Sequence, residues 1–333
     1  MKYHRFPNSD LLVSQLCFGC WGVISDTHWG ARIEDESWRA MKQAVDSGVN
    51  FFDTAPMYGD GASELLLGKF VKEHNLRHQT IIATKIRPSK MKPDDVVKEC
   101  EDSLQRLQTD FIDLYQTHWT SRDVSLDETW GAMLRLKEQG KIRFIGVSNM
   151  GIADLTQVLR LHKPLTNQLP YNLLWRMIEA EILPKCIQDD VGVLVYSPLM
   201  HGILAGNYKT AAEVPDGRAR TRHFSSARPS TRHGEPGCET ETFEALSRIR
   251  EIADHSERSM GEIALAWTMQ QPGIVSLIAG ARNADQVRDN VNFLSNPLPN
   301  GVLEQLSIAT QELKEVLGPN PDMWDSSTNS RYR

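Results

Sequence analysis

Short apolar runs recur eight times along the chain and alternate with segments of helical periodicity, which restricts the folds open to it. The runs begin near Leu16, Asn50, Thr80, Phe111, Ile142, Leu165, Gly192 and Ile274. The first seven follow one another at intervals of roughly 30 residues, the length of a strand, a helix and two short loops. This alternation predicts an α/β protein whose strands form a parallel sheet.

Two parallel architectures accommodate this pattern. An open, doubly wound sheet that binds a dinucleotide normally carries G-x-G-x-x-G after its first strand. The nearest match, residues 59–64, lacks the third glycine and follows the second run. Eight repeats suit a closed (β/α)8 TIM barrel instead. We therefore expect a single barrel domain over residues 1–333.

Three segments extend beyond the repeating pattern. Residues 1–15 resemble an N-terminal hairpin that caps the bottom of the barrel. Residues 198–258 comprise a long loop after the seventh strand and an extra helix near Phe243–Ala253. The end of the chain adds one helix and then a polar tail over residues 319–333. The apolar positions of that helix are Val302, Leu306, Ala309, Leu313 and Val316.

Composition and charge exclude several classes of protein. A net charge of −6 argues against a general nucleic-acid binder and against a polybasic membrane-surface protein. No run approaches the roughly 18 apolar residues of a membrane span, and the N-terminus shows no secretory signal. The five cysteines are scattered, which favours buried thiols in a reducing compartment. We expect a cytoplasmic protein that acts on a small molecule, with no nucleic-acid or membrane partner.

In a TIM barrel the active site lies at the C-terminal ends of the strands. Three successive runs end in Asp53, Lys85 and His118. Each residue alone has an ordinary structural explanation. Asp53 can cap the following turn, whereas Lys85 and His118 can be solvated residues at the rim. The occurrence of all three in register favours a catalytic site.

Several motifs at these strand ends resemble the aldo-keto reductase family. They are Asp53-Thr54-Ala55-Pro56-Met57-Tyr58-Gly59 with Gly61 and Ser63-Glu64, Ala83-Thr84-Lys85, Tyr115-Gln116-Thr117-His118-Trp119, Gly146-Val147-Ser148-Asn149, Gln168 with Tyr171-Asn172, and Tyr196-Ser197-Pro198-Leu199. The similarity runs in order from about residue 16 to residue 290. The ordered set is specific, although no single motif is.

The resemblance implies a catalytic tetrad of Asp53, Tyr58, Lys85 and His118. Carbonyl reduction needs a proton donor, and a tyrosine is a weak acid unless its surroundings lower its pKa. The resemblance gives Tyr58 the role of general acid and Lys85 that of its tuner. Asp53 would orient the lysine, and His118 would donate a hydrogen bond to the substrate oxygen. Taken alone, Tyr58 would be an ordinary loop tyrosine.

The resemblance also implies a nicotinamide cofactor bound in an extended pose across the barrel mouth. Ser148, Asn149 and Gln168 would bind the carboxamide, and Tyr196 would stack on the ring. Alternatively, Tyr196 is a core aromatic at a strand end. The remaining cofactor positions are Ser197, Pro198, Leu199, Gly202, Gly280, Arg282, Gln286, Asp289 and Asn290.

Arg282 decides the expected cofactor. It precedes a helix whose N-terminus suits phosphate, and it can pair with a 2′-phosphate. NADPH is therefore expected, with NADH as the alternative. Many relatives have a proline where Ala279 stands and a lysine where Gly280 stands, so the NADPH preference depends on Arg282.

Aromatic residues after the first, second and fourth strands are expected to form the substrate pocket. The pocket residues are Trp21, Trp29, Met57 and Trp119. Such walls suit apolar aldehydes or the faces of sugars. No metal is expected, because Cys17 and Cys20 form a lone C-x-x-C that strand packing explains.

The basic segment from Arg218 to His233 allows two interpretations. It is either a solvated loop or a lid near an anionic group, with Arg218 and Arg222 as the residues to test.

Three functions remain open at this point. The first is an NADPH-dependent carbonyl reductase, and the second is an NAD(P)-linked sugar or polyol dehydrogenase. The third is a cofactor-loaded accessory subunit that resembles the potassium-channel β subunits. The sequence does not indicate the oligomeric state.

Overall fold

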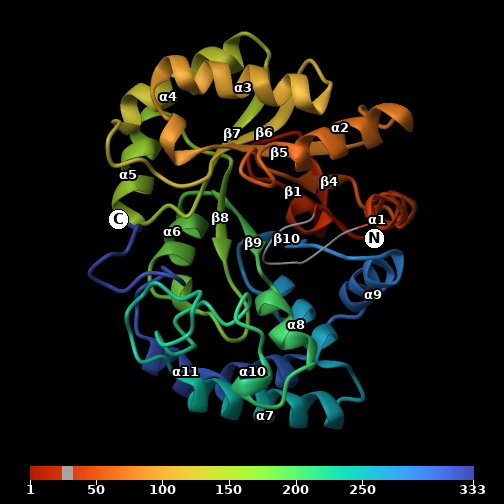
Figure 1. The fold of residues 1–333 in the computed structure, drawn as a ribbon, viewed down its shortest axis with the longest axis vertical. Helices are drawn as coiled ribbons and strands as arrows, with labels where there is room; N and C mark the ends of the chain where they lie inside the picture. The colour runs from red at the N-terminus through yellow and green to blue at the C-terminus, as the bar shows by residue number, and fades with distance from the viewer. Residues whose placement is uncertain (25–32) are drawn as a thin grey trace.

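A closed parallel barrel forms the centre of the computed structural model, which describes residues 1–24 and 33–333. Within these residues eight strands pair in the order β10-β3-β4-β5-β6-β7-β8-β9, and β9 pairs with β10 to close the ring (Figure 1). Their bounds are β3 Leu16–Gly19, β4 Phe51–Asp53, β5 Ile81–Ile86, β6 Ile112–Thr117, β7 Ile142–Ser148, β8 Thr166–Pro170, β9 Gly192–Tyr196 and β10 Ile274–Ala279. Each expected apolar run supplies one barrel strand, which confirms the (β/α)8 fold.

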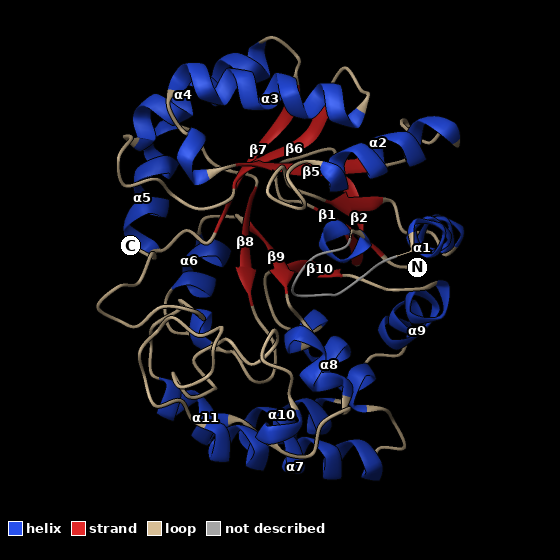
Figure 2. Ribbon diagram, viewed as in Figure 1, coloured by secondary structure: helices blue, strands red, loops and turns tan. Residues whose placement is uncertain are grey.

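Helices surround the barrel (Figure 2). They are α1 Glu34–Asp46, α2 Ala62–Glu73, α3 Pro93–Leu107, α4 Leu126–Glu138, α5 Ile152–Leu161, α6 Ile182–Gln188, α8 Met260–Met269 and α9 Ala284–Ser295. Local sequence explains where several begin. Ser125 and Ser259 cap α4 and α8 by accepting the amide hydrogens of Glu128 and Glu262. Helix α3 begins at a proline, which suits the first helical position.

The N-terminal hairpin closes the barrel at the end opposite the strand C-termini. Strands β1 (Tyr3–Arg5) and β2 (Leu12–Ser14) pair antiparallel, and His4 Nδ1 hydrogen-bonds to the Val275 carbonyl of β10. Phe6 is buried among the residues of the barrel interior and packs edge-on against Phe51 at 6.4 Å. The hairpin thus completes the barrel core from below.

Three further helices form a layer beside α8, as Figure 1 shows. They are α7 Glu239–His255, α10 Asn300–Ala309 and α11 Gln311–Leu317. The sequence predicted one helix through Val302, Leu306, Ala309, Leu313 and Val316. This prediction was wrong, because the helix is interrupted at Thr310, between α10 and α11. At this interruption Arg176 donates to the Ser307 carbonyl at 2.7 Å and to the Thr310 hydroxyl at 3.0 Å. Val316 lies on the exposed side of α11.

Replacing Phe6 tests the hairpin's contribution to the barrel core. We expect Phe6→Ala to lower the free energy of unfolding by about 3–5 kcal/mol, because it leaves a cavity in a closed core. Urea unfolding followed by tryptophan fluorescence measures the loss. Leu12→Ala in the same hairpin is the control, since Leu12 is exposed, and it should cost less than about 1 kcal/mol. Equal losses in the two variants would contradict a core role for Phe6.

Candidate active site

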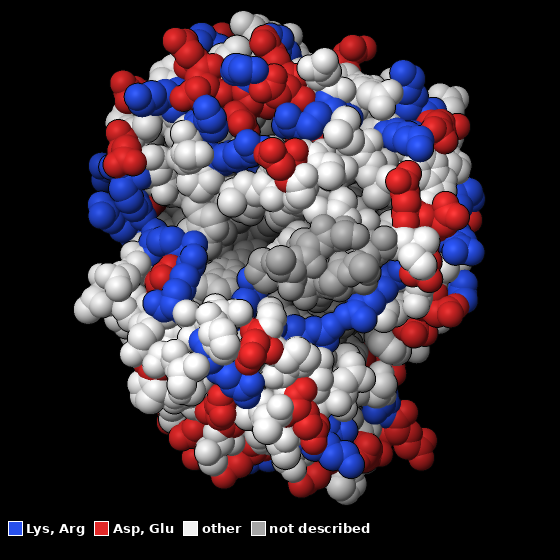
Figure 3. Space-filling model, in the orientation of Figure 1, with Lys and Arg blue, Asp and Glu red and all other residues white. Residues whose placement is uncertain are grey.

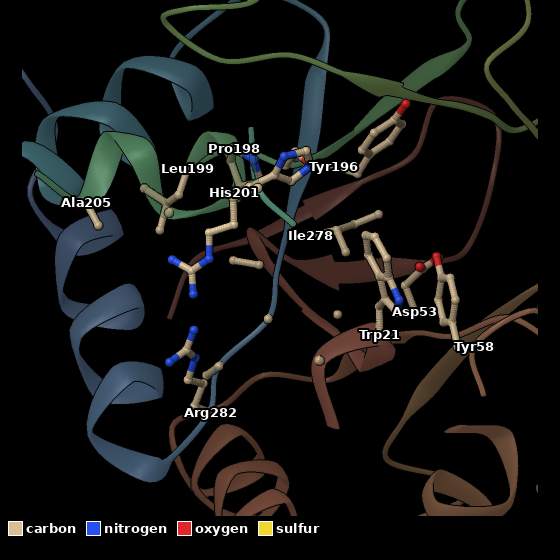
Figure 4. A pocket seen from close by; sticks show the side chains of 18 of the residues that line it. Trp21, Asp53, Tyr58, Tyr196, Pro198, Leu199, His201, Ala205, Ile278 and Arg282 are labelled. Atoms are coloured by element: carbon tan, nitrogen blue, oxygen red, sulfur yellow. The ribbon is translucent and has the colours of Figure 1, made fainter. Parts of the chain in front are cut away.

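A cavity of about 1160 Å³ opens at the C-terminal ends of the barrel strands. Figure 3 shows this hollow, with Lys and Arg side chains gathered along its rim. Figure 4 shows Trp21, Asp53 and Tyr58 grouped at one end of the cavity and Arg282 at the opposite end. The cavity is therefore elongated and chemically different at its two ends.

A buried ion pair lies beneath the tyrosine end of the cavity. Lys85 Nζ is 2.6 Å from Asp53 Oδ1, and both side chains are almost completely buried. The same ammonium donates to the Thr54 carbonyl at 2.9 Å and to the Tyr58 hydroxyl at 3.3 Å. The three residues that sequence reasoning grouped from separate strands and loops are therefore in direct contact.

Burial and charge act in opposite directions on this cluster. For Lys85, burial favours the neutral amine, but the Asp53 carboxylate outweighs it and raises the pKa above its ordinary value. For Tyr58, burial raises the pKa above 10.0, and the attraction of Lys85 only partly opposes that rise. Lys85 was expected to bring the Tyr58 pKa below its ordinary value. In the structure, burial raises that pKa by more than Lys85 lowers it. The phenol keeps its proton at neutral pH.

His118 follows β6 and faces Tyr58, with the two rings edge to face at 5.8 Å. Burial, together with the Lys85 and Arg331 cations, lowers the pKa of His118 well below 6.5. The imidazole is thus neutral at pH 7 and carries one N–H. Among the described residues its Nδ1 has no hydrogen-bond partner.

Helix α2 fixes the loop that carries Tyr58. Buried Glu64 accepts hydrogen bonds from Thr84 on β5 and from Arg106 on α3, each at 2.6 Å. Ser63 donates to the Cys20 carbonyl at 2.7 Å. Gly59 has φ +61°, and a Cβ there would lie 2.4 Å from the Ile24 side chain. These contacts leave the loop little freedom, so Tyr58 is held over Lys85.

The residues expected to bind the cofactor lie on the cavity wall. They are Ser148, Asn149, Gln168, Tyr196, Ser197, Pro198, Leu199, Gly202, Gly280, Arg282, Gln286, Asp289 and Asn290. Gln168 Nε2 donates to Asp53 Oδ2 at 2.8 Å, so it connects this wall to the buried ion pair. Asn149, with φ +57°, accepts the Tyr196 hydroxyl at 2.8 Å.

The far end of the cavity is the N-terminus of α9. The Asn283 side chain caps this helix by accepting a hydrogen bond from the backbone N–H of Gln286. The Gln286 side-chain oxygen in turn accepts a hydrogen bond from the backbone N–H of Arg282 at 2.9 Å. The Arg282 side chain is exposed beside this turn. A helix N-terminus with an adjacent guanidinium is suited to a phosphate group.

Three of the four expected pocket residues, Trp21, Met57 and Trp119, line the cavity. The fourth, Trp29, lies within residues 25–32, outside the described part of the chain. Trp21 stacks on Tyr58 with ring centroids 5.8 Å apart, and the guanidinium of Arg220 lies 5.4 Å from the Trp21 ring centroid.

Sequence reasoning missed the C-terminal tail. Trp324 and Arg331 line the cavity, and the Arg331 guanidinium lies 3.4 Å from the centroid of Trp119. Tyr332 is buried beside Trp119 at 5.5 Å. Two large aromatic residues in an otherwise polar tail were the signal that could have indicated this location.

The basic loop divides into two groups. Arg218, Arg220 and Arg232 line the cavity. Arg222, which the lid interpretation grouped with Arg218, is buried, and it donates to Glu235 at 2.7 Å and to the Leu317 carbonyl at 3.0 Å. The hypothesis of a lid containing Arg222 was wrong, because this guanidinium joins the loop to the end of α11.

Two structural absences apply to residues 1–24 and 33–333. No group of three or more His, Cys, Asp or Glu side chains is arranged there to hold a metal ion. No helix in these ranges has the length and apolar character needed to cross a bilayer.

Comparison with known proteins gives a consistent result. The sequence profile described as "Aldo/keto reductase family" matches residues 15–310. The chain belongs to the aldo/keto reductase family. It is 34% identical to aldo-keto reductase YhdN of Bacillus subtilis over 301 residues, which cover 86% of this chain and 87% of the relative.

Solved structures of the family superpose on this barrel. An aldo-keto reductase from Klebsiella pneumoniae in complex with NADPH matches with a TM-score of 0.72 and 28% identity, covering 92% of this chain and 94% of that one. A glycerol dehydrogenase from Gluconobacter oxydans matches with a TM-score of 0.78 and 26% identity, covering 96% and 97%.

The coupling between Lys85 and Asp53 can be measured as a stability difference. We expect Lys85→Met to destabilise the fold by about 3 kcal/mol or more, because it leaves a buried carboxylate without its cation. Adding Asp53→Asn in the same chain should recover much of that loss, because neither remaining side chain is charged. A double-mutant cycle from urea unfolding gives the coupling, and additive losses would contradict a tight buried pair.

Proposed function

We propose that this protein reduces aldehydes or ketones to alcohols with NADPH, and that Tyr58 is the general acid. The observation that carries this proposal is the placement of the Tyr58 hydroxyl. It lies 3.3 Å from the Lys85 ammonium and at the edge of a cavity that can admit a substrate.

The residues present fit a nicotinamide dinucleotide. One end of the cavity offers the flat ring of Tyr196 and the side-chain amide of Gln168, which suit a nicotinamide, while Asn149 holds the Tyr196 hydroxyl. The other end offers Arg282 and the first turn of α9, which suit phosphate. Gly280 between them carries no side chain, and an added Cβ would lie 3.3 Å from the Gly19 carbonyl oxygen. When bound, NADPH supplies the hydride.

The tetrad handles the proton and the developing charge. His118, held neutral by its surroundings, donates a hydrogen bond that orients the substrate carbonyl oxygen. As negative charge develops on that oxygen, Tyr58 transfers its phenolic proton to it. The Lys85 ammonium stabilises the resulting phenolate, and Asp53 holds the ammonium in place.

The reverse reaction is the second candidate. The similarity to the Gluconobacter oxydans glycerol dehydrogenase supports oxidation of a polyol or sugar at the same site. Tyr58 would then act as the base that accepts the alcohol proton, since each step in one direction is reversed in the other. A panel of aldehydes, ketoses and polyols, followed at the nicotinamide absorbance in both directions, separates the two candidates.

The role of Tyr58 is tested by removing only its hydroxyl. We expect Tyr58→Phe to lower kcat for carbonyl reduction by about 10²- to 10⁴-fold, because the substrate oxygen loses its proton donor. NADPH affinity, measured by fluorescence titration, should be unchanged.

The matched control is Tyr3→Phe, which removes a phenol that donates to the Gly48 carbonyl on the hairpin side of the barrel. It should retain full activity. A Tyr58→Phe variant as active as the parent would exclude this acid.

Arg282 should decide between the two nicotinamide cofactors. We expect Arg282→Ala to weaken NADPH binding by about 10- to 100-fold, because a charge-assisted hydrogen bond contributes roughly 1.5–3 kcal/mol. NADH lacks the 2′-phosphate, so its affinity should barely change. Titrations of both cofactors measure the difference, and equal weakening of the two would contradict 2′-phosphate recognition by Arg282.

A further inference from the structure

The C-terminal tail runs along one edge of the barrel mouth, contributes Trp324 and Arg331 to the cavity wall and ends beside α5 (Figure 1). Trp324 lies parallel to Tyr196, with ring centroids 6.0 Å apart, and it meets Trp119 edge-on at 6.2 Å. Tyr332 contacts the same Trp119 from another direction at 5.5 Å. The tail is therefore packed against Tyr196 and Trp119, which both line the cavity.

Buried Asp322 holds the tail in this position. Its Oδ2 accepts hydrogen bonds from the backbone N–H and the Nε of Arg331, at 3.1 and 2.8 Å, and its Oδ1 accepts from Arg331 Nη2 at 2.8 Å. The residue that follows Tyr332 is also held: the Arg333 carbonyl accepts a hydrogen bond from the Asp154 amide of α5 at 3.2 Å. Tyr332 thus lies between two residues, Arg331 and Arg333, whose positions are fixed by hydrogen bonds.

The Tyr332 hydroxyl donates to Asn149 Oδ1 at 2.8 Å, the same atom that accepts the Tyr196 hydroxyl. The amide nitrogen of Asn149 donates to the His118 carbonyl at 3.1 Å and to Ser148 Oγ at 3.0 Å. These four hydrogen bonds use the full capacity of a side-chain amide. Asn149 consequently joins the tail to Tyr196 and to the backbone of His118.

We infer that Tyr332 is a positioning residue for the nicotinamide end of the cofactor, acting through Asn149. This inference rests on the proposed function. The Tyr332 hydroxyl holds the Asn149 amide in one orientation, and that amide holds the Tyr196 ring at its hydroxyl and the His118 loop at its carbonyl. Without the Tyr332 hydroxyl, the Asn149 amide keeps three of its four hydrogen bonds and is held less firmly, so the stacking surface and the carbonyl-orienting histidine have a less rigid neighbour.

Tyr332→Phe tests this inference, because it keeps the ring against Trp119 and removes only the hydroxyl. We expect NADPH affinity, measured by fluorescence titration, to fall by about threefold to tenfold, the range of one intramolecular hydrogen bond. Affinity for 2′-phospho-ADP-ribose, which lacks the nicotinamide, should stay at the parent value. For an aromatic aldehyde, kcat should fall by a similar factor while its KM changes little.

A second variant and a control complete the experiment. Asp322→Asn weakens the attachment of the tail without touching Asn149, and it should shift NADPH affinity in the same direction as Tyr332→Phe. Tyr3→Phe should leave every readout at the parent value, since its phenol lies on the hairpin.

The outcomes separate this inference from the proposed function. A parent protein that binds no NADPH would overturn the proposed function and the inference together. A parent that binds NADPH with an affinity equal to that of Tyr332→Phe would overturn the inference alone. So would tighter binding by the variant, since that result would mean that the hydroxyl competes with the cofactor for Asn149. An equal loss of 2′-phospho-ADP-ribose affinity would do the same, because it would indicate a general structural effect.

Discussion

The ion pair between Lys85 and Asp53 is the constraint on which the site depends. Two charges buried inside a barrel are unfavourable unless each has close partners. Asp53 has three, because Gln168 and Gln116 donate to its second oxygen at 2.8 and 3.4 Å while Lys85 donates to the first. The lysine then has one remaining direction in which to act, toward the Tyr58 hydroxyl. The Tyr58 hydroxyl thus contacts the same ammonium that balances the buried Asp53 carboxylate.

The cavity above this pair separates two kinds of chemistry along its length. The tyrosine end is walled by aromatic rings and has a neutral imidazole, whereas the opposite end is a helix terminus beside an arginine. The loop arginines add positive charge along the rim. A ligand with a neutral ring at one end and a phosphate group at the other matches this difference between the two ends of the cavity. NADPH, which is bound in the related structure from Klebsiella pneumoniae, is a ligand of this kind.

How much could be predicted from the sequence depended on the range of each interaction. Asp53, Lys85 and His118 could be grouped from the sequence because each follows an apolar run, and the barrel brings strand ends together. The contact between Tyr332 and Asn149 joins residues 183 positions apart, so no local pattern could indicate it. The interruption at Thr310 is likewise accompanied by a distant contact, since its partner Arg176 lies 134 positions away. Arg222 was grouped with Arg218 as a residue to test for a lid, because sequence cannot distinguish a buried guanidinium from an exposed one.

The location of the described chain ends has a practical consequence for attaching this protein to other materials. The hairpin that carries Tyr3 seals the base of the barrel, whereas the carbonyl of Arg333 is bonded to α5 close to the mouth. A fusion partner, affinity handle or surface linker joined before Met1 would leave the cavity entrance unobstructed. The same addition after Arg333 would emerge beside the entrance and pull on the segment that carries Tyr332. Immobilised preparations should accordingly be oriented through the amino end.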